Sequence, residues 1–164
     1  MTTVRVRMLK LNKKTEYALL AIKFLGSRGD EPTSARGVAG HYGLPEVLLA
    51  KVLQTLKRGG VVASTKGAGG GYRLARPLGA LRVTDVFDLF HEPMALVACV
   101  DDHETCAHVV ACDIRGPMVT LNAAIHGLLA GMSLEDLFEG PQPLTGLSLF
   151  KQRSLSESTP RETG

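Results

Sequence analysis

The sequence predicts a mainly α-helical fold with one small β-hairpin, arranged as a winged helix-turn-helix followed by a long dimerisation helix. Three observations predict it: apolar residues at helical spacing up to residue 58, two strand-like runs around a glycine-rich turn, and a heptad-like apolar seam after residue 113. We expect three regions. These are a winged helix-turn-helix over residues 8–82, a cysteine-containing sensor and dimerisation region over 83–139, and a flexible tail over 140–164.

Three helices are expected before residue 60. The first covers residues 15–27, and its helically spaced apolar residues are Tyr17, Leu20, Ala21, Phe24 and Leu25. Thr33 or Ser34 can cap a short second helix, which Gly43 ends. The third helix starts with Pro45 in its first turn and runs to about Arg58. Its apolar stripe consists of Leu49, Val52, Leu53 and Leu56.

A β-hairpin is expected directly after the third helix. Residues 61–64 and 71–75 have the character of two short strands, and the segment between them contains TKGAGG. Glycines permit a positive φ and a close approach of the backbone to another molecule. The segment lacks the strand-to-helix setting and the G-K-[ST] ending of a nucleotide-binding loop. This pattern therefore favours a wing.

Apolar spacing and capping residues predict three further helices in the second half of the chain. One covers residues 83–90, capped near Thr84, and a short last helix begins after Ser133. Between them, apolar residues recur in steps of four and three, as in the seam of one helix packing along a partner. The residues of this seam are Ile114, Met118, Leu121, Ile125 and Leu128. The alternative is a stripe on the domain's own core, but a winged helix is complete by residue 82, so we expect a homodimer.

The two halves of the chain carry opposite charge. Residues 1–80 contain fourteen Lys/Arg and four Asp/Glu, whereas residues 81–150 contain two Lys/Arg and ten Asp/Glu. A basic front half indicates a polyanionic partner, although a solvated surface would also be basic. No apolar run reaches the ~20 residues of a membrane helix, and no signal peptide is recognisable. We expect a cytoplasmic protein with reduced thiols and no membrane partner.

The residues expected to contact double-stranded DNA lie at the start of the third helix and in the hairpin. In this class of fold the helix start enters the major groove. The candidates are Pro45, Glu46, Val47 and Lys51 on the helix, and Lys66, Gly69, Gly70, Gly71, Tyr72 and Arg73 in the wing. Glu46 can accept from cytosine, and Lys51 can donate to guanine or phosphate. For the basic residues the alternative is simple solvation.

All three cysteines lie within fourteen residues, as Cys99, Cys106 and Cys112 in the pattern C-x6-C-x5-C. Thiolates are the ligands of iron–sulfur clusters, and the wide gaps fit a structural zinc site poorly. A zinc site completed by His103 or His108, a thiol switch, and three buried apolar side chains remain alternatives. No nucleophile motif, paired acid and base, or nucleotide fingerprint indicates an enzyme.

The chain resembles the Rrf2 family of bacterial winged-helix transcription regulators from about Met8 to Phe138. The resemblance is carried by TEYALLAIKFL, by the block LLAKVLQTLKRGGVVASTKGAGGGYRLARP, by the three-cysteine loop and by MSLEDLF. It implies a homodimer on a pseudo-palindromic operator, expected to act as a repressor. In many members an iron–sulfur cluster controls affinity, and other members are cluster-free and act through a partner enzyme.

The resemblance also suggests the fourth cluster ligand. The iron–sulfur-assembly regulators of the family use a histidine three residues after the third cysteine, where this chain has Arg115, which cannot ligate iron. The nitric-oxide-sensing branch uses a carboxylate early in the first helix of the other subunit, and Glu16 matches it. We expect a [2Fe-2S] or [4Fe-4S] cluster held by the three cysteines and by Glu16 in trans. His103 or His108 is the alternative fourth ligand, and a dipole-stabilising surface carboxylate is the alternative role for Glu16.

Overall fold

The structure, a computed structural model, describes residues 11–91 and 112–140. Its first helix, α1 (Lys13–Ser27), is capped by Asn12, whose side chain accepts hydrogen bonds from the backbone amides of Lys14 and Thr15. The buried face of α1 differs from the predicted one, because Ala18 and Ile22 are buried whereas Tyr17, Leu20 and Phe24 are only half-buried. Ala21 and Leu25 are buried, as predicted.

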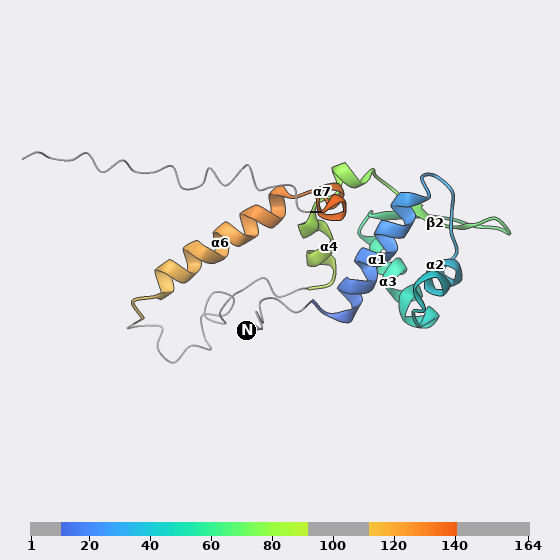
Figure 1. The fold of residues 1–164 in the computed structure, drawn as a ribbon. Coiled ribbons are helices and arrows are strands. Elements are labelled where there is room, and N and C mark those ends of the chain that lie inside the picture. The colour runs from blue at the N-terminus through green and yellow to red at the C-terminus, as the bar shows by residue number, and fades with distance from the viewer. Residues whose placement is uncertain (1–10, 92–111, 141–164) are drawn as a thin grey trace, which may run out of the picture.

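Helices α2 (Ala35–Tyr42) and α3 (Glu46–Arg58) complete the helix-turn-helix (Figure 1). The Ser34 side chain caps α2 by accepting from the Gly37 amide at 3.1 Å, and Gly43 ends it in the left-handed conformation at φ 65°. Pro45 is the N-cap of α3 rather than its first helical residue. All four residues of the predicted stripe on α3 are buried: Leu49, Val52, Leu53 and Leu56.

The wing is an antiparallel hairpin of β1 (Val62–Thr65) and β2 (Gly71–Leu74), in the register Val62 to Leu74 and Thr65 to Gly71. It projects from the helical body as two thin strands (Figure 1). A bridge between Thr33 and Tyr72 pairs the segment before α2 with the wing, through hydrogen bonds of 2.9 and 2.8 Å. Strand β2 of the wing is therefore attached to the helix-turn-helix through Tyr72, which pairs with Ser64 in the hairpin.

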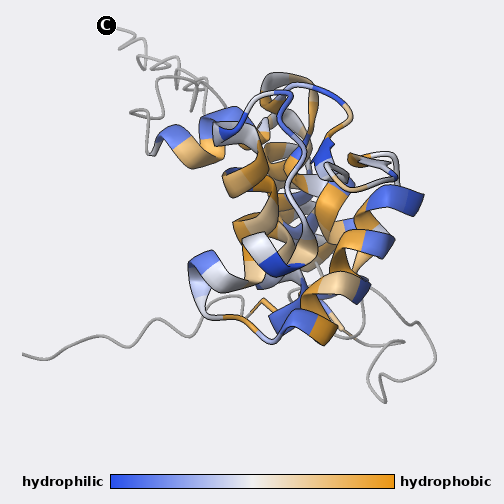
Figure 2. Ribbon diagram, turned by 90° about the vertical axis from the view of Figure 1, so that its right-hand side faces the viewer, coloured by the Kyte–Doolittle hydropathy of each residue, from blue (hydrophilic) through white to orange (hydrophobic). Residues whose placement is uncertain are grey.

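One hydrophobic core runs across residue 82, the expected boundary between two regions. A 3₁₀ turn (Leu78–Ala80) leads to α4 (Val83–Leu89), and Leu81, Val83, Val86 and Phe90 are buried with α1, α2 and α3. Figure 2 shows hydrophobic ribbon gathered where the helices face one another. Helix α4 begins at Val83, as the sequence predicts, but its N-cap is Arg82 rather than a residue near Thr84, because the Arg82 amide donates to the Asp85 carboxylate at 2.9 Å.

Helix α6 (Arg115–Gly131) extends away from the body, and α7 (Leu134–Glu139) returns to it (Figure 1). The Leu134 side chain is fully buried in the core, and its amide donates to the Leu81 carbonyl at 2.8 Å. No residue of α6 is fully buried. No helix in the described part of the chain is long and apolar enough to cross a membrane.

The predicted seam of α6 divides into two sides. Met118 and Ile125 are half-buried, whereas Ile114, Leu121 and Leu128 are exposed. Ile114 itself is the N-cap and not a helical residue. The expected cysteine loop, apart from Cys112, and the expected flexible tail after residue 140 lie outside the described residues.

Candidate nucleic-acid interface

The start of α3 presents side chains to solvent rather than to the core. Pro45 lacks an N–H, and its carbonyl accepts from the amides of Leu48 and Leu49 at 3.1 and 3.0 Å. Glu46, Val47 and Lys51 are all exposed, and Val47 is 73% accessible. The free amides at a helix N-terminus also favour anions such as phosphate. The sequence-predicted residues of α3 therefore lie together on an open surface.

An ion pair joins the two helices of the helix-turn-helix at this surface. Arg36 Nε, in the first turn of α2, lies 3.3 Å from Glu46 Oε2 at the start of α3. The Arg36 side chain is largely exposed, so it can contact a phosphate while it remains beside Glu46. Sequence reasoning missed Arg36. A basic residue one position after the start of the second helix is the signal that could have found it.

The wing residues have different structural roles. A Cβ at Gly70 would lie 2.3 Å from the Thr65 carbonyl oxygen, and a Cβ at Gly71 would lie 2.5 Å from the Thr33 carbonyl carbon. A Cβ at Gly69 would meet nothing within 4 Å. Gly70 is thus required by the hairpin turn and Gly71 by the close contact with the segment before α2, whereas Gly69 is the one of these three glycines that has open space around it.

The basic residues of the wing lie at its tip and at its base. Lys66 is exposed at the tip. Arg73 lies on β2, where Nη1 is 3.6 Å from the Asp30 carboxylate, and Tyr72 engages Thr33 through its backbone. Of the wing side chains in the prediction, Lys66 is therefore the one best placed to meet a polyanion.

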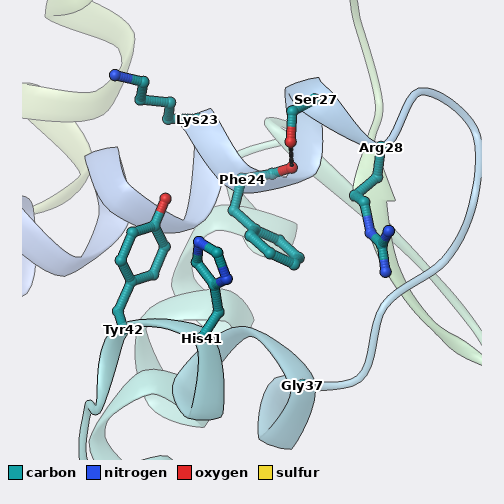
Figure 3. A pocket seen from close by; sticks show the side chains of 7 residues that line it. All are labelled: Lys23, Phe24, Ser27, Arg28, Gly37, His41 and Tyr42. Carbon is teal, nitrogen blue, oxygen red and sulfur yellow. Dashed lines mark hydrogen bonds between the residues drawn. The ribbon is translucent and has the colours of Figure 1, made fainter.

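A groove of about 680 Å³ lies between α1 and α2, lined by Lys23, Phe24, Ser27, Arg28, Gly37, His41 and Tyr42 (Figure 3). The His41 ring contacts the rings of Phe24 and Tyr42, at centroid distances of 4.8 and 4.6 Å. The Arg28 guanidinium lies 5.5 Å from the Phe24 centroid. Burial raises the pKa of Tyr42 above its ordinary value of 10.0. The ring contacts of Phe24 with His41 and Tyr42 pack α2 against α1.

Two of the four expected metal ligands lie within the described residues. Cys112 has a free, half-buried thiol three residues before α6, and Cys99 and Cys106 lie outside the described part. The Glu16 side chain is 42% exposed in the first turn of α1 and forms an ion pair with Lys13. Within residues 11–91 and 112–140, no three His, Cys, Asp or Glu side chains come together as a metal site.

The start of α1 lies beside the entrance to the cysteine segment. Asn12 Nδ2 donates to the Phe90 carbonyl at 3.3 Å, directly after α4. Glu16 follows Asn12 by one helical turn, and its backbone amide donates to the Asn12 carbonyl at 3.0 Å. A solvent-accessible carboxylate and a free thiol are compatible with the donor set of an iron–sulfur cluster.

Both the sequence and the fold match those of known proteins. Residues 11–140 match the Rrf2 family, which is described as an iron-dependent transcriptional regulator. ORF2 of Azotobacter vinelandii, named as a candidate HTH-type transcriptional regulator, is 31% identical over 136 residues, which cover 79% of each chain.

Solved structures show the same fold. The structure of CymR, the global cysteine regulator of B. subtilis, has a TM-score of 0.65 and 27% identity, and the match covers 82% of this chain and all of CymR. The structure of IscR of T. potens has a TM-score of 0.59 and 25% identity, covering 80% of this chain and 87% of that one. The winged helix-turn-helix fold class predicted from the sequence is confirmed.

Proposed function

The chain belongs to the Rrf2 family of transcriptional regulators, and from this premise we propose that it represses its target promoters as a homodimer whose operator affinity is controlled by an iron–sulfur cluster. The DNA-binding part of the proposal rests on the exposed start of α3, with Val47, Lys51 and the Arg36–Glu46 pair on one open surface. Lys66, exposed at the wing tip, is the second basic residue for which we propose a contact to DNA. The operator is expected to be pseudo-palindromic, since the two halves of a symmetric dimer read matching half-sites.

The cofactor part of the proposal is supported by three cysteines in the stretch of sequence between α4 and α6, in a family described as iron-dependent. Cys99, Cys106 and Cys112 would hold the cluster through thiolates, with the partner subunit's Glu16 as the fourth ligand. When bound, the cluster supplies a centre that reacts with nitric oxide or oxidants and is lost when iron is scarce. Glu16 must exchange its ion pair with Lys13 for this role.

The packing of α1 connects the end of α4, which precedes the cysteine segment in the sequence, to the recognition helix α3. Asn12 connects the start of α1 to the end of α4, and residues of α1 and α3 share the buried core. A displacement of α1 therefore changes the position of α3, and in a dimer it changes the separation of the two recognition helices. Such a change acts as a switch only if the two states differ in DNA affinity.

Anaerobic purification tests the cofactor. The expected result is coloured protein with iron and acid-labile sulfide in about equal amounts, as in the cluster types named above. Cys112→Ser should abolish the colour, and Glu16→Gln should change the absorbance spectrum and shorten retention of the cluster. Glu31→Gln, at an exposed carboxylate just after α1, is the matched control and should change neither. Colourless wild-type protein, free of iron and sulfide, would refute the cofactor assignment.

DNA binding is tested separately, with the dimer and fragments of the promoters it controls. Lys51→Ala and Lys66→Ala should each weaken binding and reduce its dependence on salt, because each removes a contact to a phosphate or a base. Lys14→Ala, an exposed lysine at the start of α1, is the control. Exposure of the anaerobic complex to nitric oxide, to air or to a chelator then identifies which signal releases the DNA. Equal effects of all three lysine substitutions would contradict the proposed interface.

The likeness to CymR favours a second candidate, a cluster-free regulator. That protein is named a global cysteine regulator, and it matches 82% of this chain. In this reading, the three cysteines act by thiol redox chemistry, or the acidic second half binds a metabolic enzyme. Colourless anaerobic protein that still binds DNA, together with a stoichiometric partner on purification, would favour it over the cluster.

A further inference from the structure

Val47 is the most exposed large hydrophobic residue in the described part of the chain, at 73%. The other five are Ile114, Val119, Leu121, Leu128 and Leu137, and all of them lie on α6 and α7 or directly before α6. A second copy of the chain is expected to cover apolar residues of α6. Val47 lies in the first turn of α3, apart from this group, so its exposure needs a separate reason.

The fold does not need an apolar side chain at position 47. Helix α3 packs through its buried stripe of Leu49, Val52, Leu53 and Leu56, and Val47 is outside it. Valine is also a weaker helix former than alanine, lysine or glutamate, since its branched side chain loses rotational freedom in a helix. An exposed valine here therefore costs helix stability without contributing to the core.

The neighbouring side chains leave Val47 free to contact a base. Glu46 is drawn toward α2 by Arg36, 3.3 Å away, and Pro45 is the N-cap. Lys51 lies one turn after Val47, on the same face of α3, and is also exposed. The face that α3 offers at its start thus combines one rigid apolar group and one cation.

A single base feature in the major groove matches a rigid apolar group. Each base pair presents its own pattern of donors and acceptors there, and the 5-methyl group of thymine is the apolar element. We propose that Val47 contacts a thymine methyl group in each half of the operator and thereby determines sequence preference. This inference rests on the proposed function, because it requires that the start of α3 enters the major groove.

Replacement of thymine by deoxyuridine tests the inference, because it removes the methyl group and leaves the base-pairing groups in place. The preferred operator is first selected from random DNA with the full-length wild-type dimer. Each thymine is then replaced by deoxyuridine, symmetrically in both half-sites, and binding is measured for wild type, Val47→Ala and Leu137→Ala. Leu137→Ala is the matched control, since Leu137 is an exposed apolar residue on α7.

At one thymine of each half-site, deoxyuridine should weaken wild-type binding by about fourfold per methyl group, so by about fifteenfold when both half-sites are changed. Leu137→Ala should behave like wild type, and Val47→Ala should bind thymine and deoxyuridine operators equally. Circular dichroism and thermal unfolding should show Val47→Ala folded like wild type, because the side chain is exposed.

Two results would overturn the inference, and they are distinguishable. If wild type selects a specific operator but no deoxyuridine effect depends on residue 47, Val47 does not read thymine although the chain binds DNA. If wild type selects no sequence at all, with and without its cofactor, the DNA-binding function fails together with the inference.

Discussion

The glycines of the wing differ in whether the fold has room for a side chain at their position. Gly70 and Gly71 have backbone atoms within 2.5 Å of the place where a Cβ would be, whereas Gly69 has open space. Gly70→Ala and Gly71→Ala should each lower the free energy of unfolding by roughly 1–3 kcal/mol, because the backbone must move, within the hairpin turn for Gly70 and at the contact with Thr33 for Gly71. Gly69→Ala should change it by less than about 0.5 kcal/mol. Urea unfolding of the three variants measures this difference.

Operator binding by the same three glycine variants completes the test. If Gly69 serves close approach to DNA, Gly69→Ala should weaken operator binding while its unfolding curve matches that of wild type. Equal destabilisation by all three alanines would contradict the assignment of Gly70 and Gly71 to the fold.

Thr15 carries a buried polar group that no described residue satisfies. Its side chain is fully buried in the first turns of α1, and its Oγ1 has no hydrogen-bond partner among the described residues. Because a buried hydroxyl without a partner is destabilising, Thr15→Val should raise the free energy of unfolding by about 1 kcal/mol. Chemical unfolding of the apo protein measures the change.

Thr55 provides the matched control for Thr15. Its hydroxyl donates to the Lys51 carbonyl at 3.1 Å and accepts from Arg58 at 3.2 Å, so Thr55→Val removes two hydrogen bonds and should not stabilise the protein. A Thr15→Val variant less stable than wild type would show that the hydroxyl has a partner in solution.

The residues of α1 show where the sequence is ambiguous. Apolar residues occupy nearly every position from Tyr17 to Leu25, so two helical stripes are equally apolar. The fold buries the stripe that contains Ala18 and Ala21. Small side chains allow a close approach of neighbouring helices, and this depends on the partner helices rather than on the periodicity of α1. Helix α3 has one apolar stripe, and all four of its residues were predicted correctly.

At the level of elements, a capping box closes the first turn of α7. The Ser133 side chain accepts from the Asp136 amide at 3.1 Å, and the Asp136 carboxylate accepts from the Ser133 amide at 3.0 Å. Hydrogen bonds from the Ser133 hydroxyl and amide hold the pKa of Asp136 below its ordinary value of 3.8. A carboxylate whose pKa is lowered in the folded state stabilises that state above the unfolded pKa, and this contribution is lost as the pH falls through the folded pKa.

Asp136→Asn should therefore be less stable than wild type at pH 6, and the difference should shrink as the pH falls below 3.8. Ser133→Ala should cost about 1 kcal/mol at neutral pH, since it removes a helix cap. Thermal unfolding as a function of pH measures both effects. Glu139→Gln, at the last residue of α7, is the control and should not reduce stability, because a negative charge is unfavourable at a helix C-terminus. A constant difference between wild type and Asp136→Asn down to pH 2 would contradict this account.

Elements with a local signal were predicted well, and elements set by distant contacts were not. Ser34, Gly43 and Ser133 mark helix ends through their own side chains or backbone freedom, and the structure confirms them. The pairing of residues 81–83 with residues 132–134, next to the N-cap of α4, joins two segments that are far apart in the sequence. The Arg36–Glu46 pair likewise depends on how α2 and α3 cross. Neither is visible in local sequence.

At the scale of the whole molecule, α6 projects from a compact body that contains the winged helix-turn-helix. Leu134 and the bonds between residues 81–83 and 132–134 return the chain to the core after α6, so the far part of α6 can project without losing its anchor. Apolar side chains on such a helix remain in water unless a second molecule covers them. The fold thus agrees with the dimerisation that is typical of Rrf2 regulators.

The seam and the opposite face of α6 give contrasting predictions for this dimer. Leu121 and Val119 are similarly exposed, at 45% and 43%, but lie about 160° apart around the helix axis. If the exposed side of the predicted seam, Ile114, Leu121 and Leu128, forms the dimer interface, Leu121→Asp should convert the dimer to a folded monomer, because it places a charge in an apolar interface. Val119→Asp should remain dimeric. Sedimentation equilibrium measures both masses, and circular dichroism checks that the helices remain.

A monomeric Leu121→Asp should also lose operator affinity, since each subunit then binds one half-site alone. A dimeric Leu121→Asp beside a monomeric Val119→Asp would place the interface on the other face of α6.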